Sequence, residues 1–244
     1  MNAADQLIEQ EAVHWIRRAA NKRQVIERFA SLEANKPNRY PMIIFTAGSP
    51  GAGKTEFIKG FYDPIAQTLG VIPAVIDPDA IRDLLPGYSG ANSYLFQRAV
   101  SIAVDDLFRH ILKHQQSAFV DGTLSDYTRA KQNISAVIDH HDVAMICFVF
   151  QHPVIAWHFT QLREAVEGRN IRKEDFIDKF LGAKTTVDKL KTDFGDKLNL
   201  NIILKDYKDT KENRAVAKVF TNVKSVDECL TFDYTKASIE RILP

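Results

Sequence analysis

The sequence predicts an α/β fold built on a mostly parallel sheet of about five strands, with helices on both faces. Short apolar runs alternate along the chain with stretches of helical periodicity, which is typical of a parallel sheet connected by crossover helices. One apolar run leads directly into a glycine-rich loop. The chain has 244 residues, 45% of them hydrophobic and 26% charged, which suits one globular domain with a modest addition.

The first 40 residues are predicted to form an N-terminal helical segment. Apolar residues recur at helical spacing across 4–33, and Asn21-Lys22 is expected to separate two helices. A proline-containing connector then leads into the first strand. This segment either packs on the outside of the main domain, residues 41–244, or forms a regulatory cover over its nucleotide site.

The main domain begins with an apolar run at 42–47, followed at 48–55 by Gly-Ser-Pro-Gly-Ala-Gly-Lys-Thr. This loop fits the phosphate-loop pattern G-x-x-x-x-G-K-[ST] in full, and helical spacing follows it. Glycines let successive backbone N–H groups turn toward one anion, and the N-terminus of the next helix adds its positive dipole end. The pattern predicts a bound nucleoside triphosphate; an ordinary glycine-rich turn is the alternative.

Two residues of this loop have specific roles in the prediction. Lys54 would reach the β- and γ-phosphates, and the hydroxyl of Thr55 would meet Mg²⁺. The full set of expected nucleotide-binding residues is Gly48, Ser49, Pro50, Gly51, Ala52, Gly53, Lys54 and Thr55.

Four further apolar runs predict the remaining strands. They lie at 71–76, 117–120, 143–150 and 198–204. The expected helices lie near 95–111, 130–138, 154–166 and 236–243. Because ligands of such sheets bind beyond the carboxyl ends of the strands, the polar residues that follow each strand are the candidates for chemistry.

Two carboxylates, Asp77 and Asp79, follow the second predicted strand. In phosphoryl transfer to a hydroxyl, one carboxylate can accept the hydroxyl proton and another can help to hold Mg²⁺. We assign the role of base to Asp79 and the metal to Asp77, which is nearer to the strand. Asp79 would alternatively serve as a helix N-cap before Ala80-Ile81.

Asp121 and Thr123 follow the third predicted strand. Asp121 is either a second carboxylate on the Mg²⁺ side or an acid that holds the substrate, to which Thr123 would donate a hydrogen bond. A polar turn at the end of the strand is the alternative. Asp105 lies at the flank of the apolar stripe of the preceding helix, where it points into the cleft or into solvent.

Arginines are concentrated after the fourth predicted strand. Arg163 and Arg169 would neutralise charge on the transferred phosphoryl group. Gly168 would allow an arginine-containing lid near 167–183 to close. Solvated surface arginines are the alternative interpretation.

Composition narrows the classes of partner. The net charge of +1 gives no global electrostatic footprint for nucleic acid or a membrane surface. No apolar run approaches the length of a membrane span, and the N-terminus does not have the pattern of a signal peptide. The two cysteines make neither a metal clip nor a disulfide framework. A cytoplasmic protein is therefore expected.

The assembled residues resemble the zeta-toxin family of bacterial toxin–antitoxin systems. Besides the phosphate loop, the most specific part is Val-Ile-Asp-Pro-Asp-Ala-Ile-Arg at 75–82, followed by Leu-Pro-Gly-Tyr at 85–88. Members of this family are α/β P-loop kinases that phosphorylate the sugar of UDP-N-acetylglucosamine with ATP and Mg²⁺. The resemblance implies ATP in preference to GTP, that acceptor, and an antitoxin protein or restraint in cis by the N-terminal helices.

The resemblance also implies roles for individual residues. They are a catalytic base for Asp79, nucleotide-loop contacts for Lys54 and Thr55, substrate-binding acids for Asp105 and Asp121, a substrate-side hydroxyl for Thr123, and phosphate contacts for Arg163 and Arg169. The chain reads Asp-Gly-Thr-Leu-Ser at 121–125, where the family usually has Glu-Gly-Thr-Gly-Arg. A kinase of another nucleotide cofactor or an antibiotic, or an NTP-dependent switch or binding module, is therefore the alternative.

Overall fold

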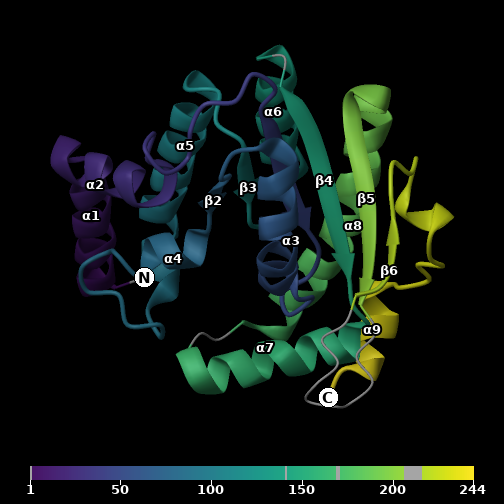
Figure 1. Ribbon diagram of the computed structural model, residues 1–244. Helices are drawn as coiled ribbons and strands as arrows, with labels where there is room; N and C mark the ends of the chain where they lie inside the picture. Colours follow the sequence, from purple (N-terminus) through teal and green to yellow (C-terminus); the bar gives the residue numbers. More distant parts are fainter. Residues whose placement is uncertain (1, 141, 169–170, 206–215) are drawn as a thin grey trace.

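The structure is a computed structural model that describes residues 2–140, 142–168, 171–205 and 216–244, and its centre is a six-stranded sheet (Figure 1). The strands lie in the order β2-β3-β1-β4-β5-β6. Their bounds are β1 Met42–Ala47, β2 Ala74–Ile76, β3 Ala118–Val120, β4 Val143–Phe150, β5 Leu198–Lys205 and β6 Val216–Phe220. The first five are parallel and β6 runs antiparallel to β5. The predicted α/β fold is therefore confirmed, and β6 is an additional strand at the edge.

Helices cover both faces of this sheet. On one face, Phe57 and Ile58 pack against apolar residues of β1, β3, β4 and β5. The opposite face is covered by α5, α6 and α8. Because both faces are buried, the strands are nearly continuous apolar runs. The helices are α1 Ala3–Arg17, α2 Ala19–Ala30, α3 Lys54–Leu69, α4 Pro78–Arg82, α5 Gln97–Lys113, α6 Tyr127–Asp139, α7 Pro153–Glu167, α8 Lys173–Phe194 and α9 Lys236–Ile242.

The N-terminal helices share the main hydrophobic core. Ile16 of α1 and Val25 of α2 are buried in the same cluster as the inner face of α5. The fully buried Gln116 donates from its side-chain nitrogen to the carbonyl oxygens of Ala30 (3.0 Å) and Asn35 (2.7 Å). Residues far apart in the sequence are thereby joined, so α1 and α2 are packed into the same domain as the sheet.

The boundary between α1 and α2 differs from the prediction. It lies at Arg18, whose ψ of 131° is extended, and not at Asn21-Lys22. The side-chain amide of Asn21 donates to the carbonyl oxygen of Trp15 (2.9 Å) from within α2. Asn21, at the predicted break, therefore supports the turn from inside the second helix. In the described part of the chain, no helix is long and apolar enough to cross a membrane.

The predicted lid overlaps the long helix α8. Its residues Phe176, Ile177 and Phe180 are buried against Trp157 of α7 and Ile239 of α9. This aromatic packing fixes the first half of α8 in the fold. The lid expected near 167–183 stays a prediction, and residues 169 and 170 of that range lie outside the described residues.

Candidate active site

The shape of the phosphate loop between β1 and α3 depends on its glycines. Gly48 and Gly51 have φ angles of 134° and 72°, in the region that favours glycine. A Cβ atom on Gly48 would lie 2.3 Å from the carbonyl oxygen of Val149, and one on Gly51 would lie 2.1 Å from that of Ala156. The loop therefore lies directly against the ends of β4 and α7, and it leads into the N-terminus of α3.

Lys54, the first residue of α3, extends back over this loop. Its Nζ donates to the carbonyl oxygens of Gly48 (3.2 Å) and Ser49 (2.7 Å). Burial lowers the pKa of the Lys54 ammonium, and the negative charge of Asp121 acts in the opposite direction. A lysine at a glycine-rich helix N-terminus is suited to bind phosphate oxygens.

Asp121 follows β3 and accepts hydrogen bonds from two threonines. The Thr55 hydroxyl donates to Oδ2 (2.9 Å), and the fully buried Thr46 of β1 donates to Oδ1 (2.8 Å). Asp121 is thus held beside the residue predicted to meet Mg²⁺. Of the two roles left open by the sequence, this position favours the one on the metal side.

Asp77 follows β2 and caps α4. Its Oδ1 accepts hydrogen bonds from the backbone N–H groups of Asp79 (2.8 Å) and Ala80 (3.4 Å). The N-cap is therefore Asp77, and the alternative interpretation of Asp79 as the cap is wrong. Burial raises the pKa of the Asp77 carboxyl, and the charges of Asp121 and Asp79 add to this, while the backbone hydrogen bonds oppose it.

Thr55, Asp77 and Asp121 all line one hollow of about 340 Å³ beside α3. Their oxygen atoms suit Mg²⁺, which is usually held by one or two carboxylates together with substrate phosphates and water. Within the described ranges, no group of three or more His, Cys, Asp or Glu side chains is arranged to hold a metal.

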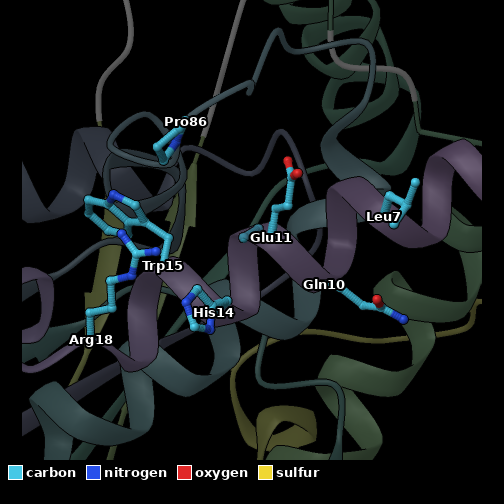
Figure 2. A pocket seen from close by; sticks show the side chains of 8 residues that line it. Leu7, Gln10, Glu11, His14, Trp15, Arg18 and Pro86 are labelled. Atoms are coloured by element: carbon cyan, nitrogen blue, oxygen red, sulfur yellow. The ribbon is translucent and has the colours of Figure 1, made fainter.

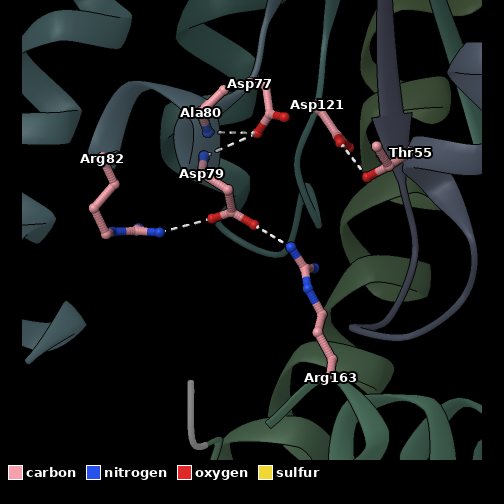
Figure 3. A network of polar contacts seen from close by, with 7 residues as sticks. All are labelled: Thr55, Asp77, Asp79, Ala80, Arg82, Asp121 and Arg163. Carbon is pink, nitrogen blue, oxygen red and sulfur yellow. Dashed lines mark hydrogen bonds and ion pairs between the residues drawn. The ribbon is translucent and has the colours of Figure 1, made fainter. Parts of the chain in front are cut away.

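Asp79 lies between two arginines from different elements (Figure 3). Arg82 of α4 donates from Nη1 to Oδ1 at 2.7 Å, and Arg163 of α7 donates from Nη2 to Oδ2 at 2.8 Å. The Arg82 side chain is only 3% exposed, whereas that of Arg163 is 46% exposed. The predicted base and one predicted phosphate contact are therefore in direct contact.

The other predicted site residues are less closely grouped. Thr123 is adjacent to the phosphate loop, because its carbonyl oxygen accepts from the Gly48 N–H (3.1 Å), and its hydroxyl lies 3.0 Å from that of Ser125. Asp105 is 53% exposed and pairs with Arg129 of α6 (2.6 Å), so the structure does not bring it to Asp79 or Asp121. Arg169 lies outside the described residues.

Two residues of the site were not assigned a role from sequence. Thr46 gave no signal, because a threonine inside an apolar strand resembles any β-branched core residue. Arg82 gave a weak signal, since it follows Asp79 by three residues in a helix and such pairs can interact. Only the fold shows that Arg82 is buried.

A second hollow, of about 600 Å³, lies on the N-terminal helix (Figure 2). It is lined by Leu7, Gln10, Glu11, Ala12, His14, Trp15 and Arg18 of α1 or its end, and by Pro86 of the segment after α4. None of the predicted site residues lines it.

The sheet order, the phosphate loop and the carboxylates at the carboxyl edge define a nucleotide-binding protein of the P-loop kinase class. The family model described as "Zeta toxin" matches residues 27–220. The chain belongs to the zeta toxin family.

Two solved structures illustrate the shared fold. One is described as the PezAT chromosomal toxin–antitoxin system of the human pathogen Streptococcus pneumoniae; it is 16% identical, with a TM-score of 0.63 over 96% of this chain and 95% of that one. The other is the AvrRxo1-ORF1:-ORF2 complex with ATP; it is 14% identical, with a TM-score of 0.57 over 83% of this chain and 62% of that one. No curated protein matches the chain. At these identities the likeness establishes a common fold.

Proposed function

We propose that this protein is a kinase that transfers the γ-phosphoryl group of ATP to a hydroxyl of a small molecule, the sugar of UDP-N-acetylglucosamine. The observation that carries the proposal is Asp79, whose carboxylate is 2.8 Å from Arg163 at the edge of the sheet that holds the phosphate loop. A carboxylate that can accept a hydroxyl proton, next to a cation for the phosphoryl group, is the arrangement kinases use. A nucleotide-dependent switch does not require such a base.

The phosphate loop and Lys54 would bind the triphosphate. Lys54 donates to the carbonyl oxygens of Gly48 and Ser49. Phosphate oxygens carry negative charge, so they attract the Lys54 ammonium more strongly than neutral carbonyl oxygens do. Lys54 would therefore exchange these carbonyl oxygens for the β- and γ-phosphates, as expected for a lysine in this loop.

Thr55 and Asp77 would hold Mg²⁺, with Asp121 beside them. This is supported by the hydrogen bond from Thr55 to Asp121 and by the hollow that Thr55, Asp77 and Asp121 line together. The bound ion would neutralise charge on the phosphates. The protein would orient the oxygen atoms that meet the ion. Thr46, inside β1, holds the Asp121 carboxylate in this way through a hydrogen bond of 2.8 Å.

Asp79 would accept the proton of the acceptor hydroxyl, and Arg163 would stabilise the phosphoryl group in transfer. Arg169 is proposed as a second phosphate contact. The sugar-nucleotide would be bound in part by Thr123, which is next to the phosphate loop. Asp105 would reach the acceptor only after giving up Arg129, to which it is now bound at 2.6 Å.

The experiment is to incubate the protein with ATP, Mg²⁺ and a panel of nucleotide sugars, nucleotide cofactors and antibiotics, and to detect the added phosphate by mass spectrometry. We expect phosphorylated UDP-N-acetylglucosamine from the wild type. Asp79→Ala should lose transfer by about 10²–10⁴-fold while still binding ATP, because it removes only the base. Lys54→Ala should lose both ATP binding and transfer.

Other outcomes of this panel would change the proposal. Phosphorylation of a different member of the panel would retain the kinase and replace the acceptor. ATP binding without transfer to any member would favour the switch or binding module.

We also propose that the kinase acts in the cytoplasm as the toxin of a toxin–antitoxin system, restrained by a separate protein. Family membership supports this, together with the two solved neighbours, one from a toxin–antitoxin system and one a two-component complex. Expression of the wild type alone should arrest growth, and Asp79→Ala should relieve the arrest. Equal growth of the two strains at equal protein levels would contradict a toxic kinase.

A further inference from the structure

Arg82 is a buried arginine whose partners are few. Its guanidinium donates to Asp79 Oδ1 and lies 6.0 Å from the centre of the Tyr88 ring. Its Nε is buried and makes no hydrogen bond to any residue that the structure describes. The whole residue is 2% exposed. Arg82 therefore places a charge in the interior with one of its donors unsatisfied.

Such a residue is a poor contributor to stability. Burying a charge is costly unless it is fully paired and hydrogen-bonded, and an unsatisfied buried donor adds to that cost. Buried ion pairs can often be replaced by apolar residues of similar volume without loss of stability. Stability of the fold therefore does not explain why an arginine stands at position 82.

The two arginines on Asp79 differ in their freedom to move. Arg82 lies at the end of the five-residue helix α4 and is enclosed by the core. Arg163 projects from α7 and is 46% exposed, so it can change partner at little cost (Figure 3). Each binds a different oxygen of the same carboxylate.

We propose that Arg82 is the positioning residue of the base: it holds Oδ1 of Asp79 throughout the reaction, while Arg163 exchanges Oδ2 for the transferred phosphoryl group. The inference rests on the proposed kinase function. When Arg163 leaves, Oδ2 is directed at the acceptor hydroxyl and takes its proton. The hydroxyl oxygen forms the new O–P bond as the bond between the γ-phosphorus and the β–γ bridging oxygen breaks, and ADP leaves.

Asp79 is then fixed from two directions. Asp77 binds the backbone N–H of Asp79 at 2.8 Å, and Arg82 binds its side chain at 2.7 Å. A misplacement of about 1 Å in a reacting group can lower a rate by about 10²-fold. Loss of Arg82 should therefore affect turnover much more than ATP binding.

The test compares three variants of the full chain: Arg82→Met, Arg82→Lys and, as a matched control, Arg109→Met. Arg109 pairs with Asp106, three residues before it, just as Arg82 pairs with Asp79, but the Arg109 side chain is largely exposed on α5. For Arg82→Met we expect kcat for phosphoryl transfer to fall about 10–100-fold and the KM for ATP to stay within about twofold. The Tm should stay close to that of the wild type, because Asp79 is 32% exposed and keeps Arg163 as a partner. Arg82→Lys, which keeps the cation, should recover part of kcat, and Arg109→Met should match the wild type.

A second measurement separates positioning from a structural effect. In the Asp79→Ala background, Arg82→Met should cause no further loss of the residual rate, because a positioning residue acts only through Asp79. An equal further loss in that background would overturn the proposal. So would a kcat within twofold of the wild type, or a Tm well below it. No transfer by the wild type to any acceptor would instead contradict the kinase function itself, and the inference with it.

Discussion

At the scale of single residues, three aspartates at the carboxyl edge of the sheet differ because their partners differ. Asp77 accepts from backbone N–H groups and caps a helix. Asp121 accepts from the hydroxyls of Thr46 and Thr55, next to the phosphate loop. Asp79 alone of the three pairs with arginines from two elements. The proposed division into metal-side acids and a base follows from these partners.

Asp77→Asn tests the electrostatics of this edge. Folding raises the pKa of Asp77 above its ordinary value of 3.8. At pH values above 3.8 the folded state therefore binds more protons than the unfolded state. The ionised Asp77 carboxylate consequently destabilises the fold at neutral pH. Asparagine keeps the cap without the charge. The variant should therefore have a higher Tm than the wild type at pH 7 in the absence of Mg²⁺, and the difference should shrink as the pH falls toward 4. A Tm difference that is constant with pH would contradict the shift.

The pair formed by the buried Arg82 and the partly exposed Asp79 shows what sequence spacing leaves open. Arg109 follows Asp106 by the same three residues, yet the arginine of that pair is 72% exposed. The spacing predicts contact in both cases. Which pair is buried depends on the surrounding elements, so the role of Arg82 could be inferred only from the fold.

At the scale of elements, the shape of the phosphate loop could be predicted, because its backbone has positive φ angles where the sequence has Gly48, Gly51 and Gly53. Strand β4 was also predicted at its observed bounds, since a strand buried on both faces is one continuous apolar run. Strand β6 was missed because it is a short antiparallel edge strand within a mixed, charged tail. The available signal was its content of Val216, Val219 and Phe220, residue types that are enriched in strands.

Gly51→Ala tests how tightly the loop is held. The new Cβ would lie 2.1 Å from the carbonyl oxygen of Ala156, and alanine is disfavoured at a φ of 72°. We expect a loss of stability of at least about 1–3 kcal/mol together with much weaker ATP binding, measured by thermal unfolding and calorimetry. Gly60→Ala in α3, whose Cβ would meet nothing within 4 Å, is the control and should retain both. Normal ATP binding by Gly51→Ala would contradict the described loop.

At the scale of the whole molecule, the N-terminal segment belongs to the same core as the sheet. Its composition and periodicity predicted two helices but not where they pack, because an amphipathic helix has the same pattern whichever partner covers it. The hydrogen bonds from Gln116 to Ala30 and Asn35 join it to the residues just before β3. The segment is therefore in a position to stabilise the domain.

Deletion of residues 1–30 tests this position. Five buried apolar residues of α1 and α2 would be lost, namely Ala12, Val13, Ile16, Val25 and Ala30. Larger apolar side chains each contribute about 1.5–3 kcal/mol when buried, and total stability is typically about 5–15 kcal/mol. We expect the truncated chain to be unfolded or to have a greatly lowered Tm. A stable truncated chain with higher kinase activity would instead establish the segment as a regulatory cover.

The central claim is that Asp79 acts as the base of phosphoryl transfer within a P-loop kinase site. The most direct measurement is the single-turnover rate of transfer from γ-labelled ATP to UDP-N-acetylglucosamine, with wild type and Asp79→Ala compared at saturating ATP and Mg²⁺. The account predicts labelled sugar nucleotide from the wild type and a rate lower by about 10²–10⁴-fold for Asp79→Ala, with unchanged ATP affinity. Transfer by Asp79→Ala at the wild-type rate would contradict it.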